Sequence, residues 1–185
     1  MKTKLIGKLL GGLCGAVLAF SASQALAVTS FEQDVSTSID RGITWLANNG
    51  AYTGSAWDAT GLPLLALMEK RASGVPSDPP QGYSGANATD KARMDSAVAF
   101  ILSSHVPAGF YAYRDGADLM ALSLYLRSGG PNPGVLAAIK TITDRTLANQ
   151  GTVATGSPGY WCYSNGYCPD SSTTQFAVAG LASAK

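Results

Sequence analysis

The sequence predicts an all-α protein built from three copies of a helix hairpin. A unit of about 55 residues recurs along 30–185, marked by Asp58, Asp115 and Asp170, which lie 57 and 55 residues apart. Each copy has a helical pattern, a glycine-rich loop carrying an aromatic residue, and a second helical pattern. The composition, 46% hydrophobic and 14% charged, excludes a disordered, collagenous or coiled-coil chain.

Capping and terminating residues divide the chain into six helices. Residues 30–33 (Ser-Phe-Glu-Gln) and 172–175 (Ser-Thr-Thr-Gln) have the spacing of capping boxes. Asn49 and Gly50 favour a helix end, and Asn132 followed by Pro133 favours a helix start. The predicted helices cover 31–48, 59–72, 88–104, 116–128, 133–149 and 171–184.

The two helices of each hairpin differ in character. The first carries charge on one face, whereas the second is apolar or small almost all round, as in 117–126 and 176–184. A helix that is apolar on every side is buried. We therefore expect two layers, with polar-faced outer helices covering buried inner helices.

The first 27 residues have the three parts of a secretory signal. Lys2, Lys4 and Lys8 precede an apolar run at 9–20, and 25–27 reads Ala-Leu-Ala. The run is shorter than the roughly 20 residues that span a bilayer, so we expect no stable membrane span; the alternative is an uncleaved anchor. The prediction is an exported protein, periplasmic or extracellular, with a domain at 28–185 and units at about 30–74, 87–129 and 132–185.

The net charge and the cysteines restrict the kinds of partner and site that we expect. The formal net charge is +1, which gives no indication of nucleic-acid binding. Cys14 lies in the leader, and Cys162 and Cys168 remain as an even pair, which predicts a disulfide in an exported protein. The alternative of a zinc site is weak, because two thiols and the distant His105 do not supply four ligands; we expect no metal.

The third copy resembles a known repeat. Leu147 and Gln150, followed by Gly-Tyr-Trp at 159–161, are similar to the QW motif of the squalene cyclase and protein prenyltransferase repeat family. In the earlier copies Asn49 and His105 stand in place of Gln150, and Tyr111 in place of the tryptophan. The resemblance implies an α/α toroid, with inner and outer helices in two concentric rings around a central cavity.

The number of repeats predicts only part of such a ring. A closed toroid of this family has about six helix pairs, and an open array exposes an inner face. Three pairs therefore suggest an N-terminal fragment of a longer protein. The alternative is a half-ring that forms an oligomer, if the chain truly ends at Lys185.

The catalytic signatures of the resembled family are missing. Its cyclases use an Asp-x-Asp-Asp cluster; the nearest match, Asp115 with Asp118, reads more simply as a helix N-cap. The zinc ligands of the prenyltransferases and the Cys-Gly-Glu-Gln run of related thioester domains are absent, and His105 reads as a helix C-terminal residue. We expect no catalytic residue and no cofactor in this segment.

The recurring loops supply the candidate binding residues. Three aspartates before the inner helices could form an acidic rim for a cation or basic ligand, or could simply cap helices. The neighbouring aromatic residues could stack on a sugar or an isoprenoid chain, or could be packing clamps between helices. The candidates are Trp57, Asp58, Tyr111, Asp115, Tyr160, Trp161, Asp170 and Gln175.

These features predict an exported α/α-toroid repeat protein that binds a small molecule, lipid or glycan in its central cavity or at its loop rim. Two alternatives stay open. One is a cyclase-like or polysaccharide lyase-like enzyme whose catalytic residues lie in a missing C-terminal half. The other is a structural or interaction scaffold, because one architecture hosts many functions.

Overall fold

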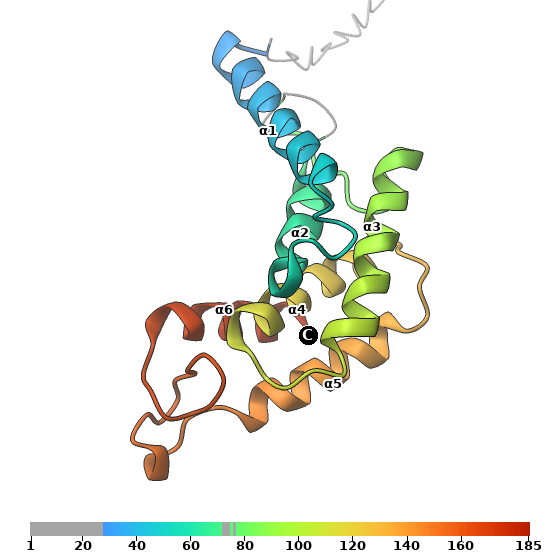
Figure 1. The fold of residues 1–185 in the computed structure, drawn as a ribbon. Coiled ribbons are helices and arrows are strands. Elements are labelled where there is room, and N and C mark those ends of the chain that lie inside the picture. Colours follow the sequence, from blue (N-terminus) through green and yellow to red (C-terminus); the bar gives the residue numbers. More distant parts are fainter. Residues whose placement is uncertain (1–27, 72–74, 76) are drawn as a thin grey trace, which may run out of the picture.

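The computed structural model describes residues 28–71, 75 and 77–185 (Figure 1). The predicted leader at 1–27 therefore lies outside the described residues. Within the described part the all-α prediction is confirmed: there are six α-helices and no β-strand, only two isolated bridges. The helices are α1 (Ser30–Asn48), α2 (Gly61–Glu69), α3 (Ala88–Phe100), α4 (Ala112–Arg127), α5 (Val135–Ala148) and α6 (Ser171–Ser183).

Three short helical turns lie between the α-helices. A 3₁₀ turn, η1 (Trp57–Ala59), leads into α2, and a π-helical turn, η2 (Ile101–His105), continues α3. A second 3₁₀ turn, η3 (Val153–Thr155), follows α5. The predicted helix at 88–104 thus exists as α3 plus η2, and its C-terminal turn is wound more loosely than an α-helix.

At two helices the residue that caps the N-terminus differs from the predicted one. Thr29, not Ser30, caps α1, in a capping box with Glu32. Asp170 caps α6 by accepting a hydrogen bond from the Thr173 amide at 2.8 Å. The predicted box at 172–175 is therefore wrong, because the carboxylate of Asp170 already occupies the capping position.

The helices from successive hairpins lie side by side, with α4 in the middle (Figure 1). α4 packs against α2, α5 and α6, and α2 also packs against α1 and α3. Leu64, Met94, Leu119, Tyr125 and Ile142 meet in one apolar core. The prediction that the second helix of each hairpin is buried is met best by α4, which is buried along most of its length. By contrast, α6 leaves Val178 exposed.

α4 and α6 run parallel and approach very closely. Tyr113 donates a hydrogen bond to Ser172 near their N-terminal ends, and Arg127 donates to the carbonyl of Ser183 near their C-terminal ends. Between these points the backbones meet at Gly116 and Gly180, where neither helix has room for a side chain. α2 begins against the second turn of α4, so the N-terminal ends of α2, α4 and α6 lie near one another.

α1 is attached to the rest of the molecule mainly through its C-terminal half. Its N-terminal half points away from the other helices (Figure 1), and Ile43 is its only buried residue. Phe31, Val35 and Ile39 form an exposed apolar stripe that lines a groove of about 410 Å³ beside the end of α2. Apolar surface of this kind is a common feature of interaction sites.

Candidate functional site

The loops before α2, α4 and α6 meet in space, and together we call them the rim (residues 53–60, 106–111 and 156–170). Arg114, in the first turn of α4, donates to Asp58 of the first loop at 3.2 Å. The Ala112 amide, at the start of α4, donates to the Tyr163 carbonyl of the third loop at 2.8 Å, which fixes the position of Tyr163 relative to α4. The structure thus brings the three recurring loops together.

Exposed aromatic side chains lie on two of the three rim loops. Trp57 is 76% exposed and has a backbone φ of +47°, a conformation that is costly for a bulky residue. Tyr160 and Tyr167 are also exposed, whereas Tyr111 is half-buried. Strained residues cluster at functional sites, so Trp57 is the candidate whose geometry most needs an explanation.

Trp161 differs from the other aromatic candidates because it lies in the interior. Its indole N–H donates to the Thr146 carbonyl at the end of α5, at 2.7 Å. Its own carbonyl accepts from the Thr173 hydroxyl at 2.7 Å, and the amide of Gln150 reaches the Gly159 carbonyl at 3.1 Å. This residue therefore joins α5 to α6, as the packing alternative expects. Gln175 is exposed on α6.

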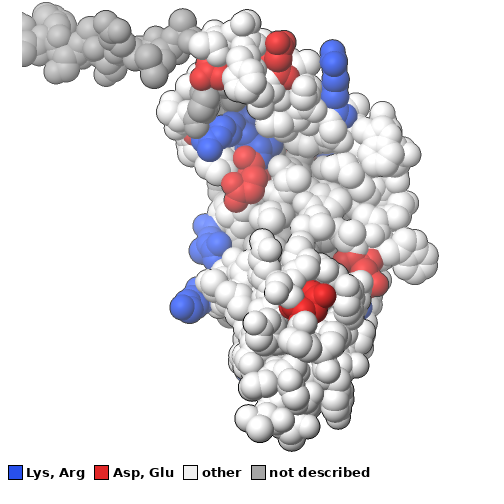
Figure 2. Space-filling model, turned by 90° about the vertical axis from the view of Figure 1, so that its left-hand side faces the viewer, with Lys and Arg blue, Asp and Glu red and all other residues white. Residues whose placement is uncertain are grey.

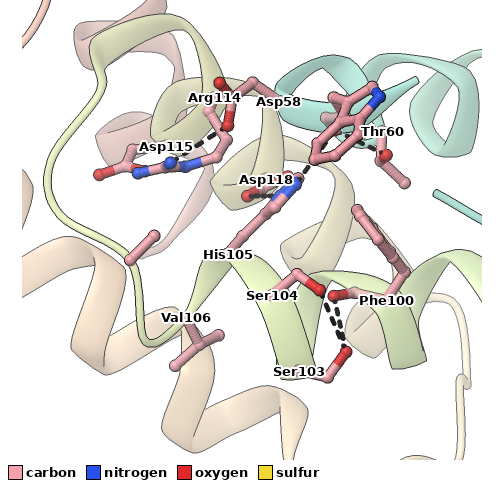
Figure 3. Close-up of polar contacts among 12 residues, drawn as sticks. Asp58, Thr60, Phe100, Ser103, Ser104, His105, Val106, Arg114, Asp115 and Asp118 are labelled. Atoms are coloured by element: carbon pink, nitrogen blue, oxygen red, sulfur yellow. Dashed lines mark hydrogen bonds and ion pairs between the residues drawn. The ribbon is translucent and has the colours of Figure 1, made fainter. Parts of the chain in front are cut away.

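The three aspartates do not form a free acidic rim. Asp115 is fully buried, and both of its oxygens accept from Arg145, at 2.6 and 2.7 Å. Arg114 donates to Asp115 at 3.1 Å and to Asp58, which is exposed (Figure 3). Asp170 is the cap of α6, and its backbone hydrogen bond with Thr173 lowers its pKa. Two of the carboxylates are thus neutralised by arginines and the third is used in capping.

The interpretation of Asp115 and Asp118 as caps is wrong, because α4 begins at Ala112 and both residues lie inside the helix. Asp118 is fully buried, and its Oδ2 lies 2.7 Å from Nδ1 of His105 (Figure 3). His105 ends η2, as its position in the sequence suggested, but it is buried rather than solvated.

The second ring nitrogen of His105 holds the strained turn. Its Nε2 lies 3.1 Å from the Trp57 carbonyl, which also accepts from the Thr60 hydroxyl at 2.8 Å. Because a carbonyl only accepts, Nε2 must carry a hydrogen. Nδ1 lies against Oδ2 of Asp118, so the hydrogen bond between them requires a proton on one of these two atoms. This pair links α3 and α4 to the turn that presents Trp57.

Burial shifts the protonation of Asp118 into the weakly acidic range. Burial raises the pKa of Asp118 to about 6, and the nearby His105 opposes this only in part. Arg114, Asp115, Asp58 and Arg145 are the other charged groups around the pair. In the unfolded chain an aspartate ionises near pH 3.9, so the folded state holds this proton more tightly.

We expect the free energy of unfolding to fall as pH rises from about 4 to about 6. The stabilising contribution is complete below the unfolded pKa and is lost through the folded pKa, up to about 3 kcal/mol. Asp118→Asn keeps a neutral group that can donate to Nδ1, and it should remove this slope. Urea unfolding of both proteins across pH 4–7 measures the difference; equal slopes would show that Asp118 does not titrate in this range.

The predicted disulfide between Cys162 and Cys168 is confirmed. It closes a short loop that carries two exposed tyrosines, Tyr163 and Tyr167. The Tyr163 ring packs edge-on against Tyr113 of α4, with the ring centres 5.7 Å apart. The third rim loop is therefore fixed both covalently and by aromatic contact with the helices.

The described residues contain no group of three or more His, Cys, Asp or Glu side chains placed to hold a metal ion. His105 has both ring nitrogens engaged inside the protein, and it has little solvent contact. Such a histidine positions the backbone around it instead of meeting a substrate. In the part of the chain that the structure describes, no helix combines the length and apolar character required to cross a membrane.

Sequence reasoning missed the roles of Arg114 and Arg145 and the pairing of Asp118 with His105. Arg114 and Arg145 neutralise Asp115, and Asp118 pairs with His105. The available signal was a charged residue, Asp118, within the inner helix predicted at 116–128, since buried charges require partners. Their spacing along the chain gave no indication of which residues pair.

Comparison with known proteins finds no matching family model, no similar curated protein and no similar solved structure. The rim geometry is therefore the basis for a functional assignment.

Proposed function

We propose that this protein is an exported helical-repeat protein that binds a ligand at the rim. The single observation that carries the proposal is the presence of exposed aromatic side chains on the first and third of three joined loops, with Trp57 held in a strained turn. Aromatic rings offer large apolar contact area together with a polar edge, which suits ligand binding. Loops placed on a rigid helical scaffold are a frequent location for such sites.

We also propose that the six helices are an arc of an α/α toroid of the squalene cyclase and prenyltransferase repeat type. The adjacency of α2, α4 and α6 supports this arrangement, as do the positions of α1, α3 and α5 against them. The QW-like segment supports it further, because Trp161 joins an outer helix to the following inner helix.

Binding without catalysis is favoured by the state of the polar groups. The buried carboxylates Asp115 and Asp118 are engaged with arginines and with His105. A general acid or base must reach the proton that it transfers, whereas Asp115 and Asp118 are buried and bonded to other protein side chains. Export is supported by the disulfide, since disulfides persist in oxidising compartments.

Hydrogen–deuterium exchange tests the rim as a binding site. The full chain is compared with and without laminarin, farnesol and trilysine, which represent a glycan, an isoprenoid and a basic ligand. We expect at least one probe to slow exchange in the rim loops and to leave α1 unchanged. Unchanged exchange of the rim with all three probes would contradict the proposal.

A scaffold role is the second candidate, and the groove beside α1 favours it. Phe31, Val35 and Ile39 expose an apolar stripe on a helix that projects from the other helices (Figure 1). Grooves of this kind accept amphipathic helices from partners. Protection confined to α1 in the exchange experiment would favour this role over rim binding.

A further inference from the structure

We propose that the disulfide-closed loop between Cys162 and Cys168 is a recognition element for uncharged polysaccharide. This inference rests on the proposed rim function and specifies its ligand class and its main contact residues. Tyr163 and Tyr167 would provide the stacking surfaces, and the polar side chains around them would provide hydrogen bonds.

The surface around this loop is almost free of charge. From residue 146 to residue 185 the chain contains only two charged side chains, Asp170 and Lys185. In Figure 2 the charged residues lie in the upper two thirds of the displayed face, and its lower end is white. A ligand with many charges would lose hydration there without gaining ionic partners, so the composition favours a neutral ligand.

The cations nearest to the rim are already engaged. Arg145 binds Asp115 and three backbone carbonyls, and Arg114 bridges Asp58 and Asp115. An anionic polysaccharide would have to displace these internal bonds, three of which involve the fully buried carboxylate of Asp115. An acidic glycan is therefore a poor match for this surface.

The exposed side chains suit a polyhydroxyl ligand. Tyr167 is 72% exposed, and Ser164 and Asn165 beside it are also exposed. Tyrosine, serine, asparagine and glycine together combine rigid contact area with adaptable hydrogen bonding. The apolar face of a sugar ring packs on an aromatic ring, while its hydroxyl groups bond to serine and asparagine. A partner that binds mainly through apolar contact would fit an aliphatic surface better than this one.

The loop is held in shape before any ligand arrives. Three contacts fix Tyr163: the disulfide next to it, its carbonyl bond to Ala112, and its ring contact with Tyr113. Tyr113 in turn packs edge-on against Phe176 of α6, with ring centres 5.0 Å apart. A surface already ordered in the free protein loses less entropy on binding.

Affinity electrophoresis tests the proposal with the full chain in its oxidised form. Native gels contain hydroxyethylcellulose, galactomannan or laminarin as uncharged probes, and alginate or heparin as anionic probes. Tyr163→Ala/Tyr167→Ala is compared with Trp45→Ala, which removes an aromatic side chain that is 64% exposed on α1. Trp57→Ala is run in parallel, and the wild type is also run after reduction of the disulfide.

We expect at least one uncharged polymer to retard the wild type and Trp45→Ala equally. The double tyrosine variant should bind it about tenfold or more weakly, and reduction should weaken binding as well. Binding of anionic polymers alone, or full affinity in the double variant, would overturn the inference. If Trp57→Ala loses binding while the double variant keeps it, rim binding stands and the tyrosine loop is rejected.

Discussion

Arg145→Ala is expected to lower the free energy of unfolding by about 3 kcal/mol, because it leaves the buried carboxylate of Asp115 without its main partner. Arg145 donates to both oxygens of Asp115 and also to the carbonyls of His105, Val106 and Ala108. One side chain thereby fixes α5, α4 and the loop between α3 and α4. Urea unfolding monitored by circular dichroism measures the loss.

Lys140→Ala is the matched control on the same helix. Lys140 pairs with Asp144 at 2.7 Å, but both side chains are mostly exposed, so its removal should cost less than about 1 kcal/mol. Arg145→Met combined with Asp115→Asn removes both members of the buried pair and should cost less than the sum of the single changes. Equal stability of Arg145→Ala and Lys140→Ala would show that the Asp115 site is not closed to water.

The helices could be predicted because the signals that define them are local. Helix-forming periodicity and the punctuation at Asn49 and Gly50 located the helices to within a few residues. The largest error was at the start of α4, which begins at Ala112 and not at 116. The segment Ala-Tyr-Arg-Asp at 112–115 looks polar, and its membership of a buried helix depends on Arg114 and Asp115 finding partners elsewhere.

The site was less predictable because its bonds join distant parts of the chain. Asp115 meets Arg145 across 30 residues, and His105 meets Trp57 across 48. No local pattern specifies such pairs. Asp58, Asp115 and Asp170 recur close to the starts of α2, α4 and α6, although Asp115 lies inside α4 and not in the loop before it. The recurrence suggested equal roles for residues that act as an exposed ion-pair member, a buried charge and a helix cap.

Gly116→Ala should lower the free energy of unfolding, whereas the similar change Gly42→Ala should not. A Cβ at Gly116 would lie 2.4 Å from the carbonyl oxygen of Phe176 in α6. That obstacle is backbone, so it cannot move aside without shifting the helix. We expect a loss of about 3 kcal/mol in the free energy of unfolding, at the upper end of ordinary overpacking costs, measured by urea unfolding.

Gly42→Ala in α1 provides the control, because no atom lies within 4 Å of the added Cβ apart from its chain neighbours and the nearby backbone of α1. There the higher helix propensity of alanine acts alone and should raise the free energy of unfolding by about 0.5–1 kcal/mol. The opposite signs of the two effects separate helix propensity from helix contact.

Displacement of α6 should also disturb the rim, since the loop before α6 presents Tyr163 and bonds to Ala112. If Gly116→Ala instead stabilises the protein as Gly42→Ala does, the close parallel packing of α4 and α6 is wrong, and the adjacency that supports the toroid proposal is lost with it.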